Sequence, residues 1–509
     1  MVKAIMHCGR RRSTGHPIVF IFLLLSGCSL LSAQTITDVW GGARSCIALC
    51  SDSTVWCWGF NWFGKDGDGT TIDRYAPIQV HGPNDVGYLK SVTAIMGGEA
   101  HNMALKADST VWCWGGNVVA TIAMGLLGNN DTTVTESHVP VQVAGPGGAG
   151  FLHSIKVLGG RGYHSLAIKS DGTVWAWGYN RRGELGNNDP SHANKCYPVQ
   201  VQGLDKPAIA VSDGYEFSVA LMSDGTLRSW GNNTTGQLGN NGSASSDVPV
   251  SVYGLTNVVQ VSCGWSHVLA VRADSTVWAW GDNATGQLGN GTHTFSNVPL
   301  QVVGLSSIVD VSGGDGSSLA LKSDGTIWKW GASDTGHTQG GPNPTDRLTP
   351  VQVTEPAGMT GVVVARARDY HNVVLTADGK VWAWGFNENG QCGDGTGNNV
   401  KTIPVLVQFP WLTATVKGPA VKTDDFSLAY SFDPFRKIVT VHLPAFDQAR
   451  APVLCIYNLT GKLIQRLPAD RRELKAAFSW NTINQPGGVY VCRVLAGEHL
   501  VTQKLILLK

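Results

Sequence analysis

The sequence has little charge and no excess of either sign. Lys, Arg, Asp and Glu make up 15% of its 509 residues, and the formal net charge is +1. Such a chain has no general affinity for nucleic-acid phosphates, and it is not the composition of a disordered acidic segment. No two cysteines are spaced Cys-x-x-Cys, which argues against a zinc finger. Beyond residue 33, no apolar run is long enough to span a bilayer.

Motifs of common catalytic sites are also missing. The sequence contains no Gly-x-Ser-x-Gly, no Walker phosphate loop, no His-Glu-x-x-His and no Rossmann fingerprint. We therefore predict no catalytic residue, no cofactor, no cofactor-binding residue and no metal ligand. We expect that the protein is not an enzyme.

Glycine and tryptophan are abundant, with 63 and 18 residues. Flexible linkers contain glycine without tryptophan, whereas short packed strands joined by tight turns use both. The tryptophans recur as Trp-x-Trp-Gly at 56–59, 112–115, 175–178, 278–281, 328–331 and 382–385. A seventh copy at 228–231 has lost its first tryptophan. Seven copies in step indicate an internal repeat.

Each repeat predicts four short strands. An Asp-Gly-Thr or Asp-Ser-Thr turn precedes the tryptophans in most copies, and Pro-x-x-Val closes the unit. The period of two puts both tryptophans of the third strand on one face and the residue between them on the other. That residue is small in six of the seven copies and Lys329 in the other. Sheets that pack a large face on a small face seven times close into a propeller.

In these motifs the units resemble the repeats of the regulator of chromosome condensation family. The resemblance implies a seven-bladed β-propeller over residues 36–410, so the expected fold class is all-β. The family includes a nuclear guanine-nucleotide exchange factor and a secreted bacterial inhibitor of β-lactamase, so the fold leaves the activity open. Residues 34–410 contain 21 Lys and Arg against 30 Asp and Glu, which argues against nucleic acid as a partner.

The first 33 residues are typical of a signal peptide. Lys3 and three consecutive arginines at 10–12 precede the apolar run 18–25, and cleavage after Ala33 is expected. A second interpretation stays open, because 25–28 reads Leu-Ser-Gly-Cys. This resembles a bacterial lipobox, in which Cys28 would carry the lipid. Either way the chain is predicted to be exported, with no transmembrane span.

A linker, 411–431, separates the repeats from residues 432–509, which have different patterning. Ile-Tyr-Asn-x-x-Gly-Lys at 456–462, Gly-Val-Tyr at 488–490 and the final Lys-x-x-Leu-x-Lys resemble the C-terminal sorting domain of type IX secretion. The resemblance implies a small β-sandwich that engages the type IX secretion machinery, so the protein is expected to pass through the periplasm and be secreted or held at the cell surface. Residues 435–509 are basic, with 11 Lys and Arg against 4 Asp and Glu. The alternative is an ordinary immunoglobulin-like module.

Four histidines occupy one repeat position, just before the second strand: His101, His164, His267 and His371. Equivalent positions in separate blades are too far apart for one ion to bind several of them at ~2.1 Å. We therefore predict one hydrogen-bonded histidine per blade and no metal ring.

Irregularities of the repeat supply the candidate ligand contacts. The second unit has extra residues near its tryptophans, and Ile122 and Met124 give this loop an apolar tip that either contacts a ligand or folds inward. Two matching insertions, 82–91 and 145–154, carry Tyr88 and Phe151 on the opposite face. These aromatic residues either receive a sugar or peptide or cover the blade edges.

Taken together, the sequence predicts an exported bacterial recognition propeller that binds an extracellular protein or glycan. Two alternatives stay open. One is a regulator like a guanine-nucleotide exchange factor, by family resemblance. The other is an exported hydrolase or lyase on a propeller scaffold.

Overall fold

The computed structural model describes residues 34–119, 122–333 and 346–413, and then seven strands between residues 429 and 507. The predicted signal peptide with Cys28 and most of the predicted linker lie outside the described residues.

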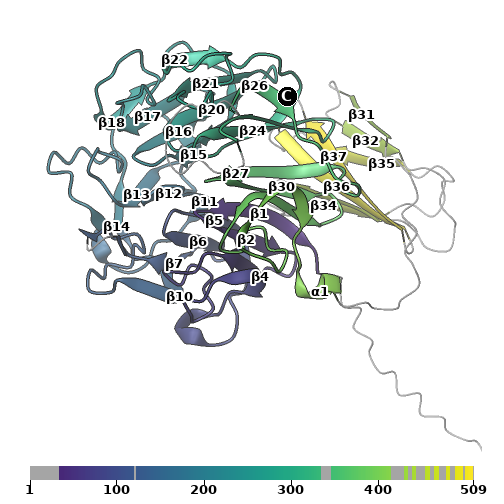
Figure 1. Cartoon of the computed structure of the whole chain (residues 1–509), viewed down its shortest axis with the longest axis horizontal. Helices are drawn as coiled ribbons and strands as arrows, with labels where there is room; N and C mark the ends of the chain where they lie inside the picture. The colour runs from purple at the N-terminus through teal and green to yellow at the C-terminus, as the bar shows by residue number, and fades with distance from the viewer. Residues whose placement is uncertain are drawn as a thin grey trace, which may run out of the picture. The chain divides into compact units, whose positions relative to one another are not determined.

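Seven four-stranded antiparallel sheets follow one another along the chain and form the blades of a β-propeller (Figure 1). Blades 1 to 3 contain β1 (Ile36–Gly42), β2 (Ser45–Cys50), β3 (Val55–Gly59) and β4 (Arg74–Gln79); β5 (Val92–Gly97), β6 (His101–Lys106), β7 (Val111–Gly116) and β10 (Glu136–Gln142); and β11 (Ile155–Gly159), β12 (His164–Lys169), β13 (Val174–Gly178) and β14 (Lys195–Gln200). Blades 4 and 5 contain β15 (Ala208–Asp213), β16 (Phe217–Met222), β17 (Leu227–Gly231) and β18 (Ser246–Ser251); and β19 (Val258–Cys263), β20 (His267–Arg272), β21 (Val277–Gly281) and β22 (Ser296–Gln301). Blades 6 and 7 contain β23 (Ile308–Gly313), β24 (Ser317–Lys322), β25 (Ile327–Gly331) and β26 (Arg347–Gln352); and β27 (Val362–Arg368), β28 (His371–Thr376), β29 (Val381–Asn387) and β30 (Asn399–Leu406).

The turn between the second and third strands is built by the Asp-x-Thr motif. In blade 1, Asp52 Oδ1 accepts hydrogen bonds from the backbone N–H and the hydroxyl of Thr54, at 3.1 and 2.6 Å. Ser53 between them has φ 64°, a left-handed conformation that Gly adopts more readily in other copies. The motif therefore produces the hairpin that the sequence predicts.

Adjacent blades pack large face on small face, as predicted. Trp330 is fully buried and lies in one apolar cluster with Ala279, the small residue of the preceding blade. Its indole N–H donates to the carbonyl of Gln287, in the long loop of that preceding blade, at 2.8 Å. The second tryptophan of blade 5, Trp280, makes the same bond to Gln237 at 3.0 Å. The tryptophan thus joins blades by both apolar contact and a hydrogen bond.

The repeated histidines also join blades, which confirms the structural interpretation. His101, His164 and His267 each form a hydrogen bond between Nε2 and a serine hydroxyl of the next blade, at 2.7, 2.7 and 3.0 Å. Burial lowers the pKa of these three histidines to about 3, so they are neutral at ordinary pH. At the seam between blades 7 and 1, His371 Nε2 lies 3.3 Å from the sulfur of Cys46.

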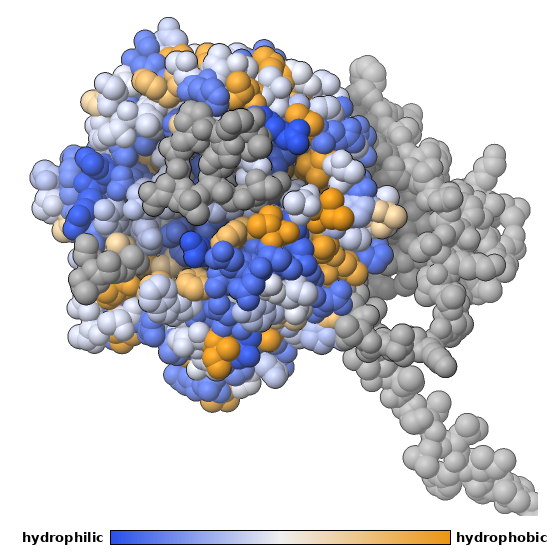
Figure 2. All heavy atoms as spheres, viewed as in Figure 1, coloured by the Kyte–Doolittle hydropathy of each residue, from blue (hydrophilic) through white to orange (hydrophobic). Residues whose placement is uncertain are grey.

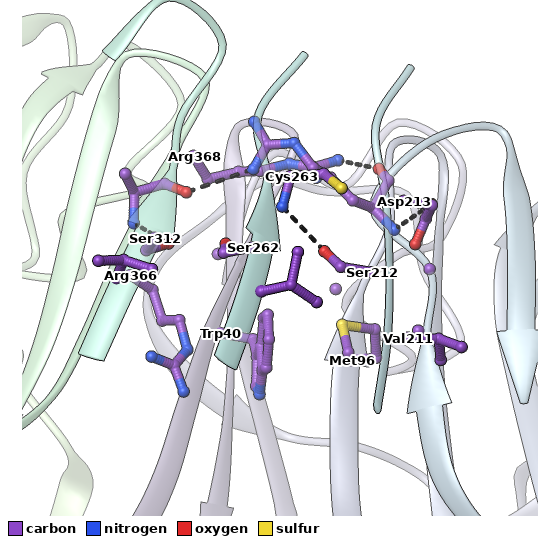
Figure 3. Close-up of a pocket in the computed structure, with 18 of the residues that line it drawn as sticks. Trp40, Met96, Val211, Ser212, Asp213, Ser262, Cys263, Ser312, Arg366 and Arg368 are labelled. Atoms are coloured by element: carbon purple, nitrogen blue, oxygen red, sulfur yellow. Dashed lines mark hydrogen bonds between the residues drawn. The ribbon is translucent and has the colours of Figure 1, made fainter. Parts of the chain in front are cut away.

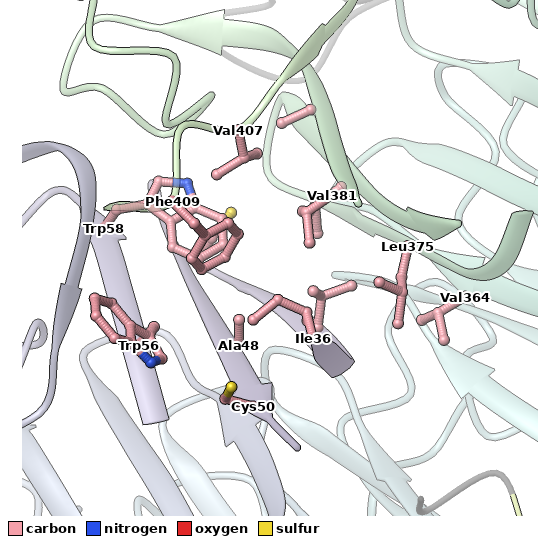
Figure 4. Packing of buried hydrophobic residues seen from close by; sticks show 14 of the residues in the cluster. Ile36, Ala48, Cys50, Trp56, Trp58, Val364, Leu375, Val381, Val407 and Phe409 are labelled. Carbon is pink, nitrogen blue, oxygen red and sulfur yellow. The ribbon is translucent and has the colours of Figure 1, made fainter. Parts of the chain in front are cut away.

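The ring closes without an exchanged strand, because blades 1 and 7 are each built from consecutive strands. A shared apolar cluster fills the seam, with Ile36 from blade 1 and Val364 from blade 7 (Figure 4). Phe409 follows the last strand and packs its ring edge-on against Trp58, with the ring centroids 5.6 Å apart. Residues just after β30 therefore complete the core of blade 1.

The last strands form two further antiparallel sheets. One has the order β31 (Ala429–Asp433), β32 (Ile438–His442) and β35 (Ala477–Asn481); the other has β34 (Leu463–Pro468), β33 (Val453–Asn458), β36 (Gly488–Ala496) and β37 (His499–Leu507). Before them, α1 (Pro410–Thr413) is a single turn. Whether the two sheets form the expected sandwich stays a prediction.

Candidate functional site: the loop face around the propeller axis

The first strands of the seven blades surround a central cavity of about 180 Å³ (Figure 3). Three serines at equivalent positions connect neighbouring inner strands. Ser212, Ser262 and Ser312 each accept a hydrogen bond from a backbone N–H of the next blade, at 2.9, 3.2 and 3.0 Å. The serine hydroxyls thus supply acceptors for backbone N–H groups that no β-ladder pairs across the boundary between blades.

Two arginines cross the axis where the first strands end. Arg161 donates from Nη1 to the Gly313 carbonyl at 2.6 Å and from Nη2 to Asp315 at 2.9 Å. Arg368 donates from Nη2 to Glu99 at 3.1 Å and also to the carbonyl of Arg161. The two guanidinium groups therefore link blades 2, 3, 6 and 7 at this end of the cavity.

Carboxylates surround the two arginines. We call the whole group the axial cluster; its members are Glu99, Arg161, Asp213, Asp315, Arg368 and Asp369. Asp213 is 1% exposed, and its Oδ2 accepts two backbone N–H bonds at 2.8 Å each. Burial raises its pKa to about 7. Burial, and then the charge of Asp369, also raise the pKa of Glu99 and of Asp315.

A separate ion pair lies earlier on the same inner strands. Arg366 donates from Nη1 to Asp310 at 2.8 Å, and its guanidinium carbon is 4.6 Å from the centroid of the Trp40 ring. Burial raises the pKa of Asp38 to about 6, although the charge of Arg366 opposes the shift. This ion pair lies within the propeller, where it links blades 6 and 7.

Aromatic side chains form an arc beside the axial cluster. We call them the aromatic arc: Trp62, Phe63, Tyr163, Tyr179, Tyr215 and Trp265. The rings of Tyr215 and Trp265 are stacked with centroids 4.0 Å apart, and Tyr163 meets Tyr215 edge-on at 5.5 Å. Trp62 stacks on Phe63 at 5.5 Å, and Phe63 packs against the small apolar cluster that contains Tyr179. The arc therefore takes its rings from blades 1, 3, 4 and 5.

The arc and the axial cluster lie on one face. Tyr163, Tyr215 and Trp265 follow the first strands of their blades, whereas Trp62 and Tyr179 follow third strands. Because the strands are antiparallel, the connections between first and second strands and between third and fourth strands emerge on the same side. We call this side the loop face. Trp62 is 65% exposed. The three aromatic residues that follow first strands are half-buried, so these side chains remain partly accessible: Tyr163, Tyr215 and Trp265.

The extra loop of blade 2 lies on the loop face, but its Met124 is not placed as the ligand-contact interpretation expects. Its short strands β8 (Val118–Val119) and β9 (Ile122–Ala123) pair with each other. Met124 is 6% exposed and packs with Ala100, Leu126 and Tyr179, so it folds inward and supports the arc. For Ile122, the backbone is described and the side chain lies outside the described residues.

The two matching insertions have the same structure on the opposite face. Each contains one short 3-10 turn, η1 (Pro83–Asp85) and η2 (Pro146–Gly148), and buries a leucine. Tyr88 is 50% exposed and Phe151 is 59% exposed. Tyr88 makes a ring contact with His81 at 5.8 Å rather than with Phe151. Ligand binding by these two residues stays a prediction.

Sequence reasoning missed the loop face, although a signal was present. The residue after Trp-x-Trp-Gly is aromatic in blades 1, 3 and 7, as Phe60, Tyr179 and Phe386. The position before the second strand is Tyr163 in blade 3 and Tyr370 in blade 7. Comparing these variable positions between repeats would have placed aromatic side chains on one face.

Within the described ranges, no group of three or more His, Cys, Asp or Glu side chains is arranged to hold a metal ion. The same residues contain no helix that is long and apolar enough to cross a membrane. Figure 2 shows small groups of hydrophobic residues between hydrophilic ones on the visible surface of the blades.

Comparison with known families agrees with this architecture. The profile of the RCC1-like domain matches residues 124–421, and that of the regulator of chromosome condensation (RCC1) repeat matches residues 52–105. The chain belongs to the RCC1-like domain family. The family resemblance read from the repeats is thus confirmed, and with it a propeller fold that is suited to binding.

Individual relatives match over part of their length. The ultraviolet-B receptor UVR8 of Arabidopsis thaliana is 31% identical over 223 residues, which are 43% of this chain and 47% of the receptor. The human E3 ubiquitin-protein ligase HERC2 is 30% identical over 218 residues, 42% of this chain but 4% of the ligase. The chain therefore matches about half or less of these relatives.

Solved structures share the fold. Human WBSCR16 superposes with a TM-score of 0.60 at 20% identity, covering 70% of this chain and 95% of WBSCR16. Yeast RCC1 (Prp20), in its complex with Kap60, gives 0.57 at 20% identity and covers 80% of this chain and 92% of Prp20. At this identity the likeness concerns the fold alone.

Proposed function

We propose that this protein is a recognition propeller that binds a protein or glycan partner through its loop face. The observation that carries the proposal is the aromatic arc. Aromatic residues dominate the energetically important part of protein interfaces and also stack on sugars. Here they span several blades beside a charged cluster, a combination that fits a binding surface better than a packing surface. The proposal includes three claims: the partner is a protein or a glycan, the loop face binds it, and the protein does not catalyse a reaction.

A matched pair of variants tests which face binds. The double variant Trp62→Ala, Trp265→Ala removes two rings of the arc, while Tyr88→Ala, Phe151→Ala removes the two exposed rings of the opposite face. Proteins and glycans captured from the native environment by the unchanged chain should be lost by the first variant and kept by the second. The reverse pattern would assign binding to the opposite face, and loss by neither would refute the proposal.

We further propose that the protein acts outside the cell. The support is the basic and apolar pattern of residues 1–33, and the likeness of residues 432–509 to type IX sorting domains, which implies a small β-sandwich and delivery across the outer membrane. A chain without residues 432–509 should accumulate in the periplasm as a folded propeller. Its appearance at the cell surface or in the medium would contradict this assignment.

The same proposal includes ordinary cleavage after Ala33. The variant Cys28→Ser should then mature normally. Loss of processing together with loss of an acyl label would show that Cys28 is the lipidated residue instead.

A further inference from the structure

We propose that the axial cluster is a subsite for a cationic side chain, an arginine guanidinium or a lysine ammonium, of the bound partner. This inference rests on the proposed recognition function and names the chemistry that its centre accepts. Three observations support the inference: the acidic side chains of the cluster, its carboxylate oxygens without hydrogen-bond donors, and the aromatic rings beside it.

The cluster has more acidic than basic side chains. Its four carboxyl groups face two arginines, and Lys65 and Arg44 are further basic residues beside them. Lys65 is 1% exposed, and its ammonium donates to three carbonyls, those of Ala43, Gly98 and Glu99, at 2.9, 3.3 and 2.9 Å. Its ammonium is thus committed to the backbone and forms no ion pair with a carboxylate of the described residues. Burial raises the pKa of Glu99, Asp213 and Asp315, and an incoming cation would favour the charged form of these carboxyl groups.

Two buried carboxylate oxygens of the axial cluster have no hydrogen-bond partner among the described residues. One is Oδ1 of Asp213, a side chain that is 1% exposed and borders the central cavity. The other is Oδ1 of Asp369, whose Oδ2 accepts the backbone N–H of Arg44 at 3.1 Å. Buried oxygens without donors cost free energy, and an incoming N–H donor would remove that cost.

The cluster can be reached from the loop face. The side chains of Glu99 and Asp315 are 16% and 19% exposed, although both bind arginines. The charges of Glu99 and Asp369 help to raise the pKa of Tyr163, and those of Asp315 and Asp369 help to raise the pKa of Tyr370, after burial in each case. Both tyrosines therefore flank the carboxylates, and their rings offer faces to a cation.

A small probe tests the inference directly. The probe is the acetylated, amidated tripeptide Gly-Arg-Gly, and its control is the same peptide with uncharged citrulline in place of arginine. Titration of the full chain by calorimetry should show the arginine peptide binding at least about tenfold more tightly, with the advantage shrinking as salt is added. Equal affinity for the two peptides would overturn the inference.

Binding should also release protons at pH 7, because a cation favours the charged carboxylates. The measured enthalpy should then change between buffers of different ionisation enthalpy. Enthalpies that do not depend on the buffer would mean that the peptide binds away from the buried carboxylates, which also contradicts the inference.

Variants separate this inference from the proposed function. Asp369→Asn and, independently, Glu99→Gln should each weaken binding of the arginine peptide by about tenfold. Asp205→Asn, in the connection between blades 3 and 4 and paired with Arg228, should leave that binding unchanged. Thermal unfolding verifies that each variant folds. If partner capture requires Trp265 while Asp369→Asn and Glu99→Gln both bind the arginine peptide normally, the proposed function stands and the cationic subsite is refuted.

Discussion

The interfaces between blades and the loop face use the repeat in opposite ways. At the interfaces, one chemical solution recurs in blade after blade: a buried tryptophan on a small residue, and a histidine on a serine. At the loop face, equivalent positions carry different side chains: two residues before the second strand stand Tyr215, Trp265 and Asp315 in blades 4, 5 and 6. What recurs holds the ring together, and what varies is free to recognise a partner.

The largest expected effect is at the interface tryptophans. Trp280→Ala should lower the free energy of unfolding by about 3–5 kcal/mol, because it leaves a large cavity and removes a hydrogen bond between blades. Its neighbour Trp278 on the same strand is half-buried, so Trp278→Ala should cost about 1–2 kcal/mol. Chemical denaturation of the two variants measures the difference, and equal losses would contradict the distinction between the two tryptophans.

The histidine–serine bond should have an intermediate effect. Ser218 accepts from His164 and donates to the carbonyl of Glu184 at 2.9 Å. Ser218→Ala therefore leaves the buried Nε2 of His164 unpaired and removes one of two donors from the Glu184 carbonyl, which keeps the indole N–H of Trp230 at 2.7 Å. We expect a loss of about 2 kcal/mol in the same denaturation experiment. Ser223→Ala, at an exposed turn, is the control and should change stability by less than about 0.5 kcal/mol.

The two regions should also respond to pH with opposite signs. Burial lowers the pKa of His164 to about 3, so the unfolded chain binds a proton that the folded chain does not, and stability falls as pH decreases from about 6.5. Burial raises the pKa of Asp213 to about 7, so the folded chain binds the extra proton, and stability gains as pH decreases from 7 towards 4. Unfolding midpoints measured from pH 4 to 8 test this. On acidification, the midpoint of His164→Gln should fall less than that of the unchanged chain, and the midpoint of Asp213→Asn should fall more. Unchanged slopes in both variants would refute this account.

The smallest effect on stability is expected at the loop face. Trp62 is 65% exposed, so Trp62→Ala should change the free energy of unfolding by less than about 0.5 kcal/mol. Partner capture should nevertheless weaken, because the variant removes accessible ring surface. A stability loss comparable to that of Trp280→Ala would assign Trp62 to the core instead.

The sequence predicts the interfaces well and the loop face poorly, for a physical reason. Alternation along one strand is enough to put Trp280 and Ala279 on opposite faces, and one repeat position is enough to align the histidines. The aromatic arc depends on contacts between different blades, such as Tyr215 on Trp265, and these follow from how the loops are stacked. Local pattern likewise leaves open whether Met124 points outwards or inwards, and the packing around Tyr179 decides it.

Hydrogen exchange of the captured complex tests the central claim most directly. With the partner bound, we expect protection of the connections after the first strands of blades 3, 4 and 5, at residues 160–163, 214–216 and 264–266, and little change at 82–91 and 145–154. Protection confined to the two insertions, with none at the loop face, would contradict the account.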